Sequence, residues 1–198
     1  MGYLFFKTTL PDPGLPPGLG GGLTLESWRP TLRRPLPPRL PLVPFGIWCA
    51  FHLLGIFATR DFFILLIRHG LRPVHRTCVL PAHWRFPFMA PRDLQVAGLW
   101  THPDWRGRGL GLAALREVPR HLGAPGRTLW YMVHEDNLPS IRLAQKAGLA
   151  LWGRGGRVDR WGLRALGSYR VGEVLPAGEP RRSGPDGRIL KFGGGSDE

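Results

Sequence analysis

The chain has 198 residues and a formal net charge of +13 at pH 7, a size that suits one domain with additional tails. Such a basic chain commonly binds a polyanion, but the positive charge comes from 24 Arg and only 3 Lys, which are spread along the sequence. Residues 45–171 alone hold 18 basic and 7 acidic residues, a net charge of +11, so no basic tail carries the charge. We therefore expect an anionic small ligand and no nucleic-acid partner.

Two cysteines, Cys49 and Cys78, lie within apolar stretches and outside any Cys-x-x-Cys or Cys/His metal spacing. This usage is typical of buried free thiols in the reducing cytoplasm, so we predict a cytoplasmic protein without a metal site. The most apolar stretch, residues 45–58, is shorter than the roughly 20 residues that a membrane span needs. We expect no stable membrane insertion.

The N-terminal part of the chain is dense in residues that break regular structure. Residues 1–44 contain many Pro and Gly, which predicts a flexible segment. Residues 45–58 then predict a buried helix because they are almost entirely apolar.

Apolar runs along the middle of the chain predict strands. Residues 62–67 and 74–80 flank a His-Gly turn and predict a buried strand pair. Residues 81–91 combine three prolines with aromatic side chains, which predicts a loop that either packs on the core or forms the wall of a binding site. Residues 94–100 and 128–133 predict two further strands.

Two helices are predicted after these later strands. Residues 107–122 show helical spacing, with a kink or an early end near Glu117 because Pro119 removes a ladder hydrogen bond. The second helix is predicted between Asn137, a good N-cap, and Gly148, a good C′ residue.

The C-terminal part predicts a last pair of strands and then a tail. The strands are expected at residues 149–152 and 157–170, around a glycine-rich turn at residues 153–156. Residues 172–198 return to Pro, Gly and charge, which predicts a flexible tail. The folded domain is therefore predicted at residues 45–171.

A glycine-rich turn with two arginines, Trp105–Gly111, lies between a predicted strand and a predicted helix. A helix start offers unpaired amide groups and a partial positive charge, glycines let the backbone approach phosphate oxygens, and arginines add charge-assisted hydrogen bonds. The turn lacks the Gly-Lys-Ser/Thr ending of a nucleotide-triphosphate loop, and Leu112 stands where a dinucleotide fingerprint needs its third glycine. The turn predicts a phosphate-binding site of another kind.

The remaining pattern, Arg106-x-x-Gly109-x-Gly111, resembles the pyrophosphate-binding signature of the GNAT superfamily of N-acetyltransferases. The segment from Asn137 to Leu149 looks like the second motif of that family, a helix that leads to Gly and an apolar residue. The resemblance implies an α/β fold with a mixed, mainly antiparallel sheet, a splayed central strand pair and flanking helices. It also implies acetyl-coenzyme A (acetyl-CoA) as the acyl donor.

The resemblance implies a path of donor contacts across the chain. Backbone groups of Leu99, Trp100 and Thr101 would pair with the pantetheine arm. Amides of the turn would hold the pyrophosphate, namely those of Arg106, Gly107, Arg108, Gly109, Leu110 and Gly111. Asn137 and Ser140 would lie along the same channel, although each also suits a purely structural place at a helix start.

In this family an amine attacks the thioester directly, so a base must first remove a proton from the ammonium form. We favour His75 as this base because it lies in a predicted strand beside the expected acyl site. His83, His102 and Glu135 are alternatives, and Gln95 could hold a water molecule.

The residue that serves as general acid in many members of the resembled family is absent from the matching position of this chain. Many members of the family that this chain resembles carry a Tyr in the second helix that protonates the leaving thiolate, and this chain has Ala144 at the matching position. Tyr131, in a predicted strand, is the candidate substitute, although a strand Tyr is more often a packed core residue.

Together these features predict an N-acetyltransferase that acts on a small primary amine, with the oligomeric state left open. The segments at residues 75–81 and 85–89 are similar to acetyltransferases of surface-polysaccharide synthesis, which implies an amino sugar as one acceptor. Ala144 supports an alternative, a CoA-binding or interaction domain that is weakly active or inactive.

Overall fold

The computed structural model describes residues 2–10, 19–35, 40, 42–122, 126–160 and 162–175. Its elements are, in chain order, β1 (Tyr3–Thr9), β2 (Leu23–Trp28), α1 (Leu42–Leu53), β3 (Phe63–His69), β4 (Arg72–Pro81), β5 (Leu94–Thr101), the 3-10 turn η1 (Pro103–Trp105), α2 (Leu110–Glu117), the 3-10 turn η2 (Val118–His121), β6 (Thr128–His134), α3 (Leu138–Lys146), β7 (Ala150–Arg160) and β8 (Leu163–Val174).

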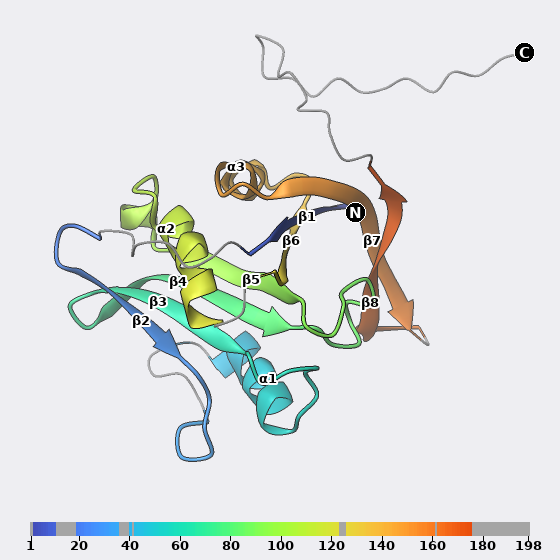
Figure 1. The fold of residues 1–198 in the computed structure, drawn as a ribbon. Coiled ribbons are helices and arrows are strands. Elements are labelled where there is room, and N and C mark those ends of the chain that lie inside the picture. The colour runs from blue at the N-terminus through green and yellow to red at the C-terminus, as the bar shows by residue number, and fades with distance from the viewer. Residues whose placement is uncertain are drawn as a thin grey trace, which may run out of the picture.

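The eight strands of the described chain form one sheet in the order β2-β3-β4-β5-β6-β1-β7-β8 (Figure 1). Every neighbouring pair is antiparallel except β5 and β6, which run parallel. This is the mixed, mainly antiparallel sheet that the sequence predicts.

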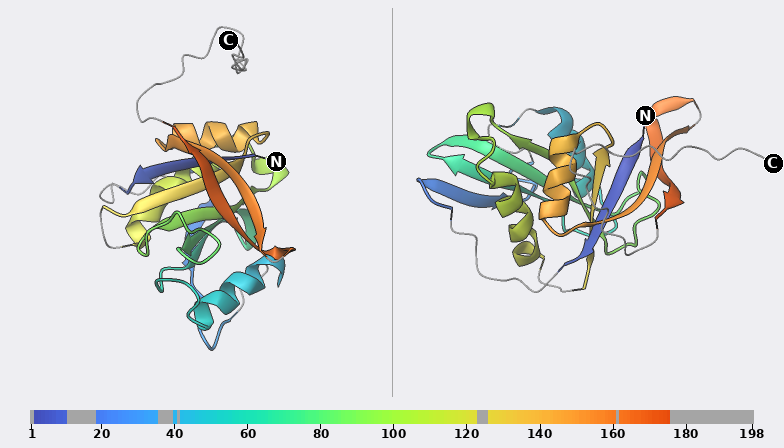
Figure 2. Two further views of the ribbon diagram at one scale, coloured as in Figure 1. Left: turned by 90° about the vertical axis from the view of Figure 1, so that its right-hand side faces the viewer. Right: turned by 90° about the horizontal axis from the view of Figure 1, so that it is seen from above.

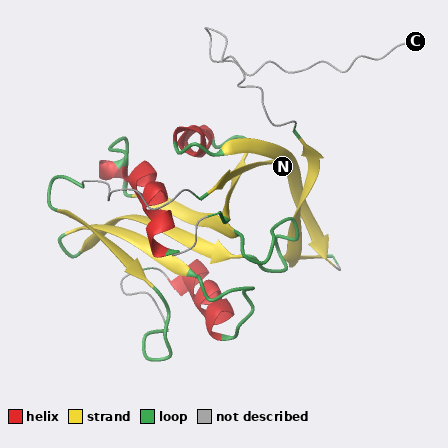
Figure 3. Ribbon diagram, in the orientation of Figure 1, coloured by secondary structure: helices red, strands yellow, loops and turns green. Residues whose placement is uncertain are grey.

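Helices cover both faces of the sheet, as Figures 2 and 3 show. Alternate residues of β3 make the division clear, because successive side chains of a strand point to opposite faces. Phe63 and Leu65 pack in one core with side chains of α2 and α3. Ile64 and Leu66 pack in a second core with side chains of α1. We refer to these two sides as the α2/α3 face and the α1 face.

The N-terminal segment departs from the prediction. β1 lies inside the sheet between β6 and β7, and its Phe5 and Phe6 are each only 1% exposed. β2 pairs with β3 at one edge of the sheet. The prediction of a flexible segment over residues 1–44 is therefore wrong for β1 and β2, while residues 11–18, 36–39 and 41 lie outside the described residues. The partners of β1 are far away in sequence, so no local pattern reveals them.

The predicted helices are present with adjusted ends. α1 begins and ends a few residues earlier than the predicted helix at residues 45–58. α2 ends at Glu117 and the chain continues as η2, which contains Pro119, so the predicted early end is confirmed. α3 begins after Asn137, whose Oδ1 accepts a hydrogen bond from the Ser140 amide at 3.2 Å, and Gly148 follows it with φ of +80°. Both predicted caps of α3 are confirmed.

The C-terminal hairpin differs from the prediction. β7 continues through residues 153–156, where the sequence predicts a turn. A Cβ added at Gly153 would lie 2.6 Å from the carbonyl oxygen of Glu173 in β8. These glycines therefore allow β8 to approach closely, and the predicted turn is wrong. β8 ends at Val174, just inside the predicted tail, and residues 176–198 of that tail lie outside the described part of the chain.

Candidate functional site

β5 and β6 separate after a short stretch of pairing. Their parallel register extends only from the pair Leu94–Leu129 to the pair Val96–Tyr131. The register of β5 against β4 shifts immediately afterwards, where Gly98 has φ of +58°. A bulge bends a strand locally and increases its twist, so β5 turns at the point where β6 leaves it.

A cavity of about 320 Å³ opens at this separation. The stretch of β5 at residues 97–99 lines one side of it. Asn137 and Ser140 line it from the α2/α3 face, and Trp48 and Phe86 line it from the α1 face. The cavity therefore has walls on both faces of the sheet and lies between the two separated strands.

The glycine-rich turn follows the end of β5 and leads into α2. Gly107 and Gly109 have φ of +74° and +75°, and an added Cβ would meet nothing within 4 Å at either position. The backbone conformation, rather than lack of space, therefore favours glycine there. At Gly111 an added Cβ would lie 3.1 Å from Leu143, so this glycine lets α2 pack closely on α3.

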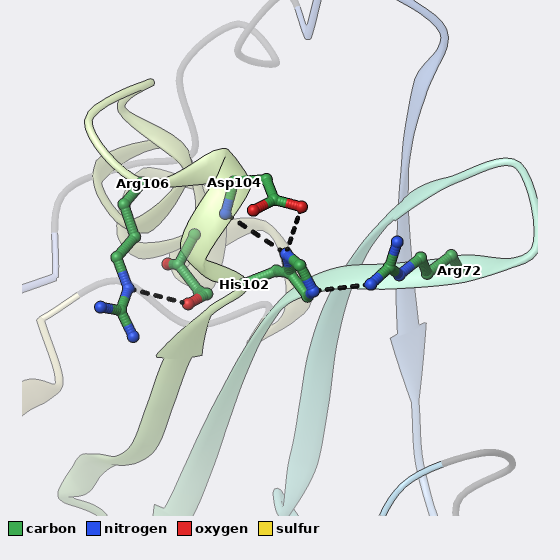
Figure 4. A network of polar contacts seen from close by, with 5 residues as sticks. Arg72, His102, Asp104 and Arg106 are labelled. Atoms are coloured by element: carbon green, nitrogen blue, oxygen red, sulfur yellow. Dashed lines mark hydrogen bonds and ion pairs between the residues drawn. The ribbon is translucent and has the colours of Figure 1, made fainter.

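Polar contacts hold the turn against the sheet (Figure 4). Arg72 Nη2 lies 2.6 Å from His102 Nε2, and the His102 ring also contacts the backbone amide of Asp104 through Nδ1 at 3.3 Å. Arg106 Nε donates a hydrogen bond to the carbonyl oxygen of Thr101 at 3.3 Å. Arg72 and Arg106 thus tie the turn to β4 and to the end of β5, and the Asp104 carboxylate lies 3.5 Å from His102 Nδ1 in the same cluster.

The next two residues of the turn contribute in different ways. The guanidinium of Arg108 lies 4.6 Å over the ring of Trp105 and is exposed. The side chain of Leu110 is buried with Ile67 and Val74. Leu110 therefore has only its backbone amide to present to a ligand, as the first residue of α2.

Only one of the three residues predicted to contact the pantetheine arm lies at the cavity. Leu99 lines the cavity, whereas Trp100 and Thr101 do not. Trp100 stacks over the guanidinium of Arg76 at 4.9 Å, and Thr101 bonds to His75 and Arg106. The cavity wall instead includes Ala97 and Gly98, which directly precede Leu99 in β5.

Tyr131 is the last residue of β6 that pairs with β5. It is 5% exposed and lines the cavity. Burial raises the pKa of its hydroxyl, and a hydrogen bond with Ser140 opposes that shift. The phenol therefore stays protonated at neutral pH. Ala144, in contrast, is completely buried in the core of the α2/α3 face.

His75 is not among the residues that line the cavity, which does not fit the expectation that it acts as the base. Its side chain is fully buried, and its ring nitrogens lie 2.8 Å from the hydroxyls of Thr101 and Thr77. Burial lowers the pKa of His75 to about 4. An imidazole with both nitrogens engaged and no exposed surface cannot reach an amine, so the geometry does not support His75 as the general base.

The alternative bases are also engaged elsewhere. His83 is buried, and its Nδ1 bonds to the carbonyl oxygen of Pro81 at 3.1 Å. His102 belongs to the contacts that hold the glycine-rich turn. Glu135 accepts a hydrogen bond from the Gly2 amide at 3.1 Å. Of His83, His102, Glu135 and Gln95, only Gln95 lines the cavity; it is 2% exposed, and its side-chain oxygen has no hydrogen-bond partner.

Two further residues with basic side chains line the cavity. His134 ends β6, lines the cavity, and has its Nδ1 3.4 Å from a carboxylate oxygen of Asp136. Arg85, in the loop between β4 and β5, lines the cavity from the α1 face. The proline-rich loop thus has both of its predicted roles, because Phe86 and Met89 are buried in a core cluster while Arg85 and Phe86 line the cavity.

Neither cysteine lines the cavity. Both are free and buried, as predicted, and burial raises the pKa of Cys49 to about 11 and of Cys78 to about 12. Among the described residues no group of three or more His, Cys, Asp or Glu could hold a metal ion. No helix within the described ranges is long and apolar enough to cross a membrane.

A model of the acetyltransferase (GNAT) family matches residues 47–149, just over half of the chain. The chain belongs to the GNAT family. The match includes the glycine-rich turn, both separated strands and the capped start of α3. The predicted fold is thus confirmed, and the resemblance to amino-sugar acetyltransferases of polysaccharide synthesis has no counterpart in this match.

Three similar proteins are longer than this GNAT chain. Mycothiol acetyltransferase from Thermobifida fusca is 32% identical over 111 residues, which cover 50% of this chain and 34% of that protein. A GCN5-related N-acetyltransferase from Sphaerobacter thermophilus has a TM-score of 0.54 at 18% identity, over 77% of this chain and 49% of its own. A tandem GNAT protein from the clavulanic acid biosynthesis pathway has a TM-score of 0.53 at 19% identity, over 77% and 51%. The chain spans about a third of the first relative and about half of the two structures.

Proposed function

We propose that this GNAT domain transfers an acetyl group from acetyl-CoA to a small primary amine. The observation that carries the proposal is the separation of β5 and β6, which opens a cavity with walls on both faces of the sheet. The donor would enter from the α2/α3 face and the amine from the α1 face, so that they meet between the strands.

The donor site follows from the backbone of β5, α2 and α3. The turn at residues 106–111 would hold the pyrophosphate with the amides at the start of α2 and the nearby arginines. The pantetheine arm would lie along residues 97–99, on the side of β5 that β6 no longer pairs. The carboxamide oxygen of Asn137 already caps α3. The N–H groups of the same carboxamide would therefore form the hydrogen bonds to acetyl-CoA.

Tyr131 would act as the general acid. In the reaction the amine nitrogen forms a bond to the thioester carbon while the carbon–sulfur bond breaks. Tyr131 would give its proton to the departing sulfur and regain the proton that the new amide nitrogen loses. The raised pKa of this buried hydroxyl supports the role, because the proton is present at neutral pH.

His134 would act as the general base in place of His75. It lies on β6 beyond the point of separation, and it can accept the proton of the incoming ammonium and pass it to solvent. The buried side-chain amide of Gln95 would hold the amine or a relaying water, because its oxygen has no other partner.

A second candidate function is the catalytically inactive CoA-binding domain, which Ala144 favours. Release of free thiol from acetyl-CoA, measured over a panel of simple amines and amino sugars, distinguishes the two. Transfer predicts thiol release that depends on the amine and equals the acetylated product. Tight acetyl-CoA binding without turnover on any acceptor would support the inactive domain.

The variant Gly109→Glu tests the donor site. Its carboxylate would repel the pyrophosphate, so we expect acetyl-CoA affinity to fall by at least about tenfold, or ~1.4 kcal/mol. Gly126→Glu is the matched control, because Gly126 also has positive φ and open space and precedes β6 at the opposite end of the parallel pair. Titration calorimetry measures both. Unchanged affinity in Gly109→Glu would refute the assignment of the turn.

A further inference from the structure

Arg85 is held in place by the loop that contains it. Within this loop the Phe86 amide donates to the His83 carbonyl at 2.9 Å, and the Ala90 amide donates to an Asp93 carboxylate oxygen at 2.9 Å. The same carboxylate oxygen accepts a hydrogen bond from the indole of Trp130 in β6 at 2.8 Å. The loop is therefore anchored to the sheet, and Arg85 is positioned before any ligand arrives.

A second set of contacts fixes Arg85 against β8. The Tyr169 amide donates to the Arg85 carbonyl at 2.8 Å, and Arg85 Nε donates to the Gly167 carbonyl at 3.4 Å. The rings of Phe86 and Tyr169 stack with centroids 5.6 Å apart. Arg85, Phe86 and Tyr169 thus form one rigid wall of the cavity.

The electrostatic environment of this wall is positive. Burial lowers the pKa of Arg85, and the neighbouring charge of Arg157 lowers it further. Arg157 lies 5.6 Å over the ring of Tyr169. Among the described residues that line the cavity there is no Asp or Glu. A guanidinium on the wall of a cavity whose described lining residues include no Asp or Glu favours an anion in that cavity, because charge-assisted hydrogen bonds to a guanidinium are strong.

We propose that the acceptor carries an anionic group, a carboxylate or a phosphate, which the Arg85 guanidinium binds. This inference rests on the proposed amine acetylation. The anion would anchor one end of the acceptor at the wall while its amine reaches Gln95 and His134. The aromatic rings of Trp48, Phe86 and Tyr169 suit an apolar or ring-shaped body between the two ends.

The test compares paired amines that carry or lack the anion. Glucosamine 6-phosphate is paired with glucosamine, and phenylalanine with its amide, at saturating acetyl-CoA. We expect kcat/KM to be at least about tenfold higher for the charged member of one pair, since a charge-assisted contact typically contributes that much. The pair that responds tells whether the anion is a phosphate or a carboxylate.

The variant Arg85→Gln should remove this preference mainly through KM for the charged acceptor, while KM for acetyl-CoA stays unchanged. Arg85→Lys should retain part of it. Arg154→Gln is the matched control, because Arg154 is exposed on β7 and does not line the cavity. Equal use of charged and neutral amines, or equal losses for both in Arg85→Gln, would overturn the proposal.

Failure of the proposed function gives a different result. If no amine is acetylated, titration calorimetry of the charged and neutral members still decides the anion site. Binding of a charged member that is lost in Arg85→Gln supports the site on a non-catalytic domain. Equal binding of both members, or none, overturns it.

Discussion

Tyr131 and His134 are three residues apart on β6, and this spacing turns their side chains toward opposite faces of the sheet. Tyr131 packs with the core of the α2/α3 face and meets Ser140, whereas His134 contacts the ring of Tyr3. In the proposed mechanism this strand would therefore present the acid on the donor side and the base on the acceptor side. This division suits direct transfer, in which the two proton movements occur at different atoms.

Replacement of Tyr131 by Phe tests the acid. The ring is kept, so the core is preserved and the free energy of unfolding should fall by only about 1 kcal/mol for the lost hydrogen bond. We expect kcat to fall by about 10²-fold with KM for acetyl-CoA nearly unchanged, because the hydroxyl acts on the departing sulfur. Steady-state kinetics at saturating amine measure both. An unaltered kcat would exclude Tyr131 as the acid.

Two histidine variants separate catalysis from stability. His134→Gln should lower kcat by about 10²-fold and leave the fold intact, because His134 lies at the cavity. His75→Gln should lower stability by roughly 1–3 kcal/mol with little effect on kcat of the folded fraction, because it disturbs the buried contacts to Thr101 and Thr77. The reverse pattern in urea unfolding and steady-state assays would restore His75 as the base.

At the level of elements, β1 provides hydrogen-bonded pairing for β6, one of the two separated strands. It pairs with β6 from Tyr3 opposite His134 to Thr9 opposite Thr128, and its other edge pairs with β7. β6 parts from β5 and then has β1 as its continuous partner. β1 therefore stabilises the strand that carries Tyr131 and His134.

The variant Phe6→Ala tests this role. Phe6 is 1% exposed in the core of the α2/α3 face, so we expect the free energy of unfolding to fall by about 3–5 kcal/mol. Leu32→Ala is the control, because Leu32 is 88% exposed and should change stability by less than about 0.5 kcal/mol. Urea denaturation followed by tryptophan fluorescence measures both. A loss below 1 kcal/mol for Phe6→Ala would contradict the buried placement of β1.

The elements that the sequence predicts well are those with local signals. Asn137 and Gly148 mark the ends of α3 because a cap needs only nearby residues, and Pro119 ends α2 for a similar reason. β1 has no such local signal, because its partners β6 and β7 are distant in sequence. The glycines of β7 were misinterpreted because close approach and a turn both favour glycine, and only the position of β8 distinguishes them.

In the candidate site too, only the features with a local sequence signal can be predicted. The glycine-rich turn carries its chemistry in consecutive residues, so the sequence alone predicts it. Arg85 and His134 meet at one cavity only because the loop after β4 packs on β8 and because β6 parts from β5. His134 could have been suspected from its place after a predicted strand and before a capped helix, since active-site residues often follow strands.

For the whole molecule, two buried histidines predict a dependence of stability on pH. Burial lowers the pKa of His75 and of His83 to about 4, from an ordinary value of 6.5. Below pH 6.5 the unfolded chain binds protons that the folded protein does not, so stability present above pH 6.5 is lost as the pH falls toward 4. Each group contributes up to about 1.4 kcal/mol per pH unit in this interval.

Urea denaturation between pH 7 and pH 4 measures this slope. The double variant His75→Gln, His83→Gln should be less stable at pH 7 and should lose less further stability on acidification. A double variant whose free energy of unfolding falls as steeply as that of the original chain would show that other groups control acid unfolding.

The central claim is that the opening between β5 and β6 receives the donor. A crystal structure with acetyl-CoA bound tests it most directly. We predict the pyrophosphate at the amides of residues 106–111, the pantetheine arm along residues 97–99, and the sulfur beside the Tyr131 hydroxyl. A donor bound outside the separated strands, or with its pyrophosphate away from the glycine-rich turn, would contradict the account.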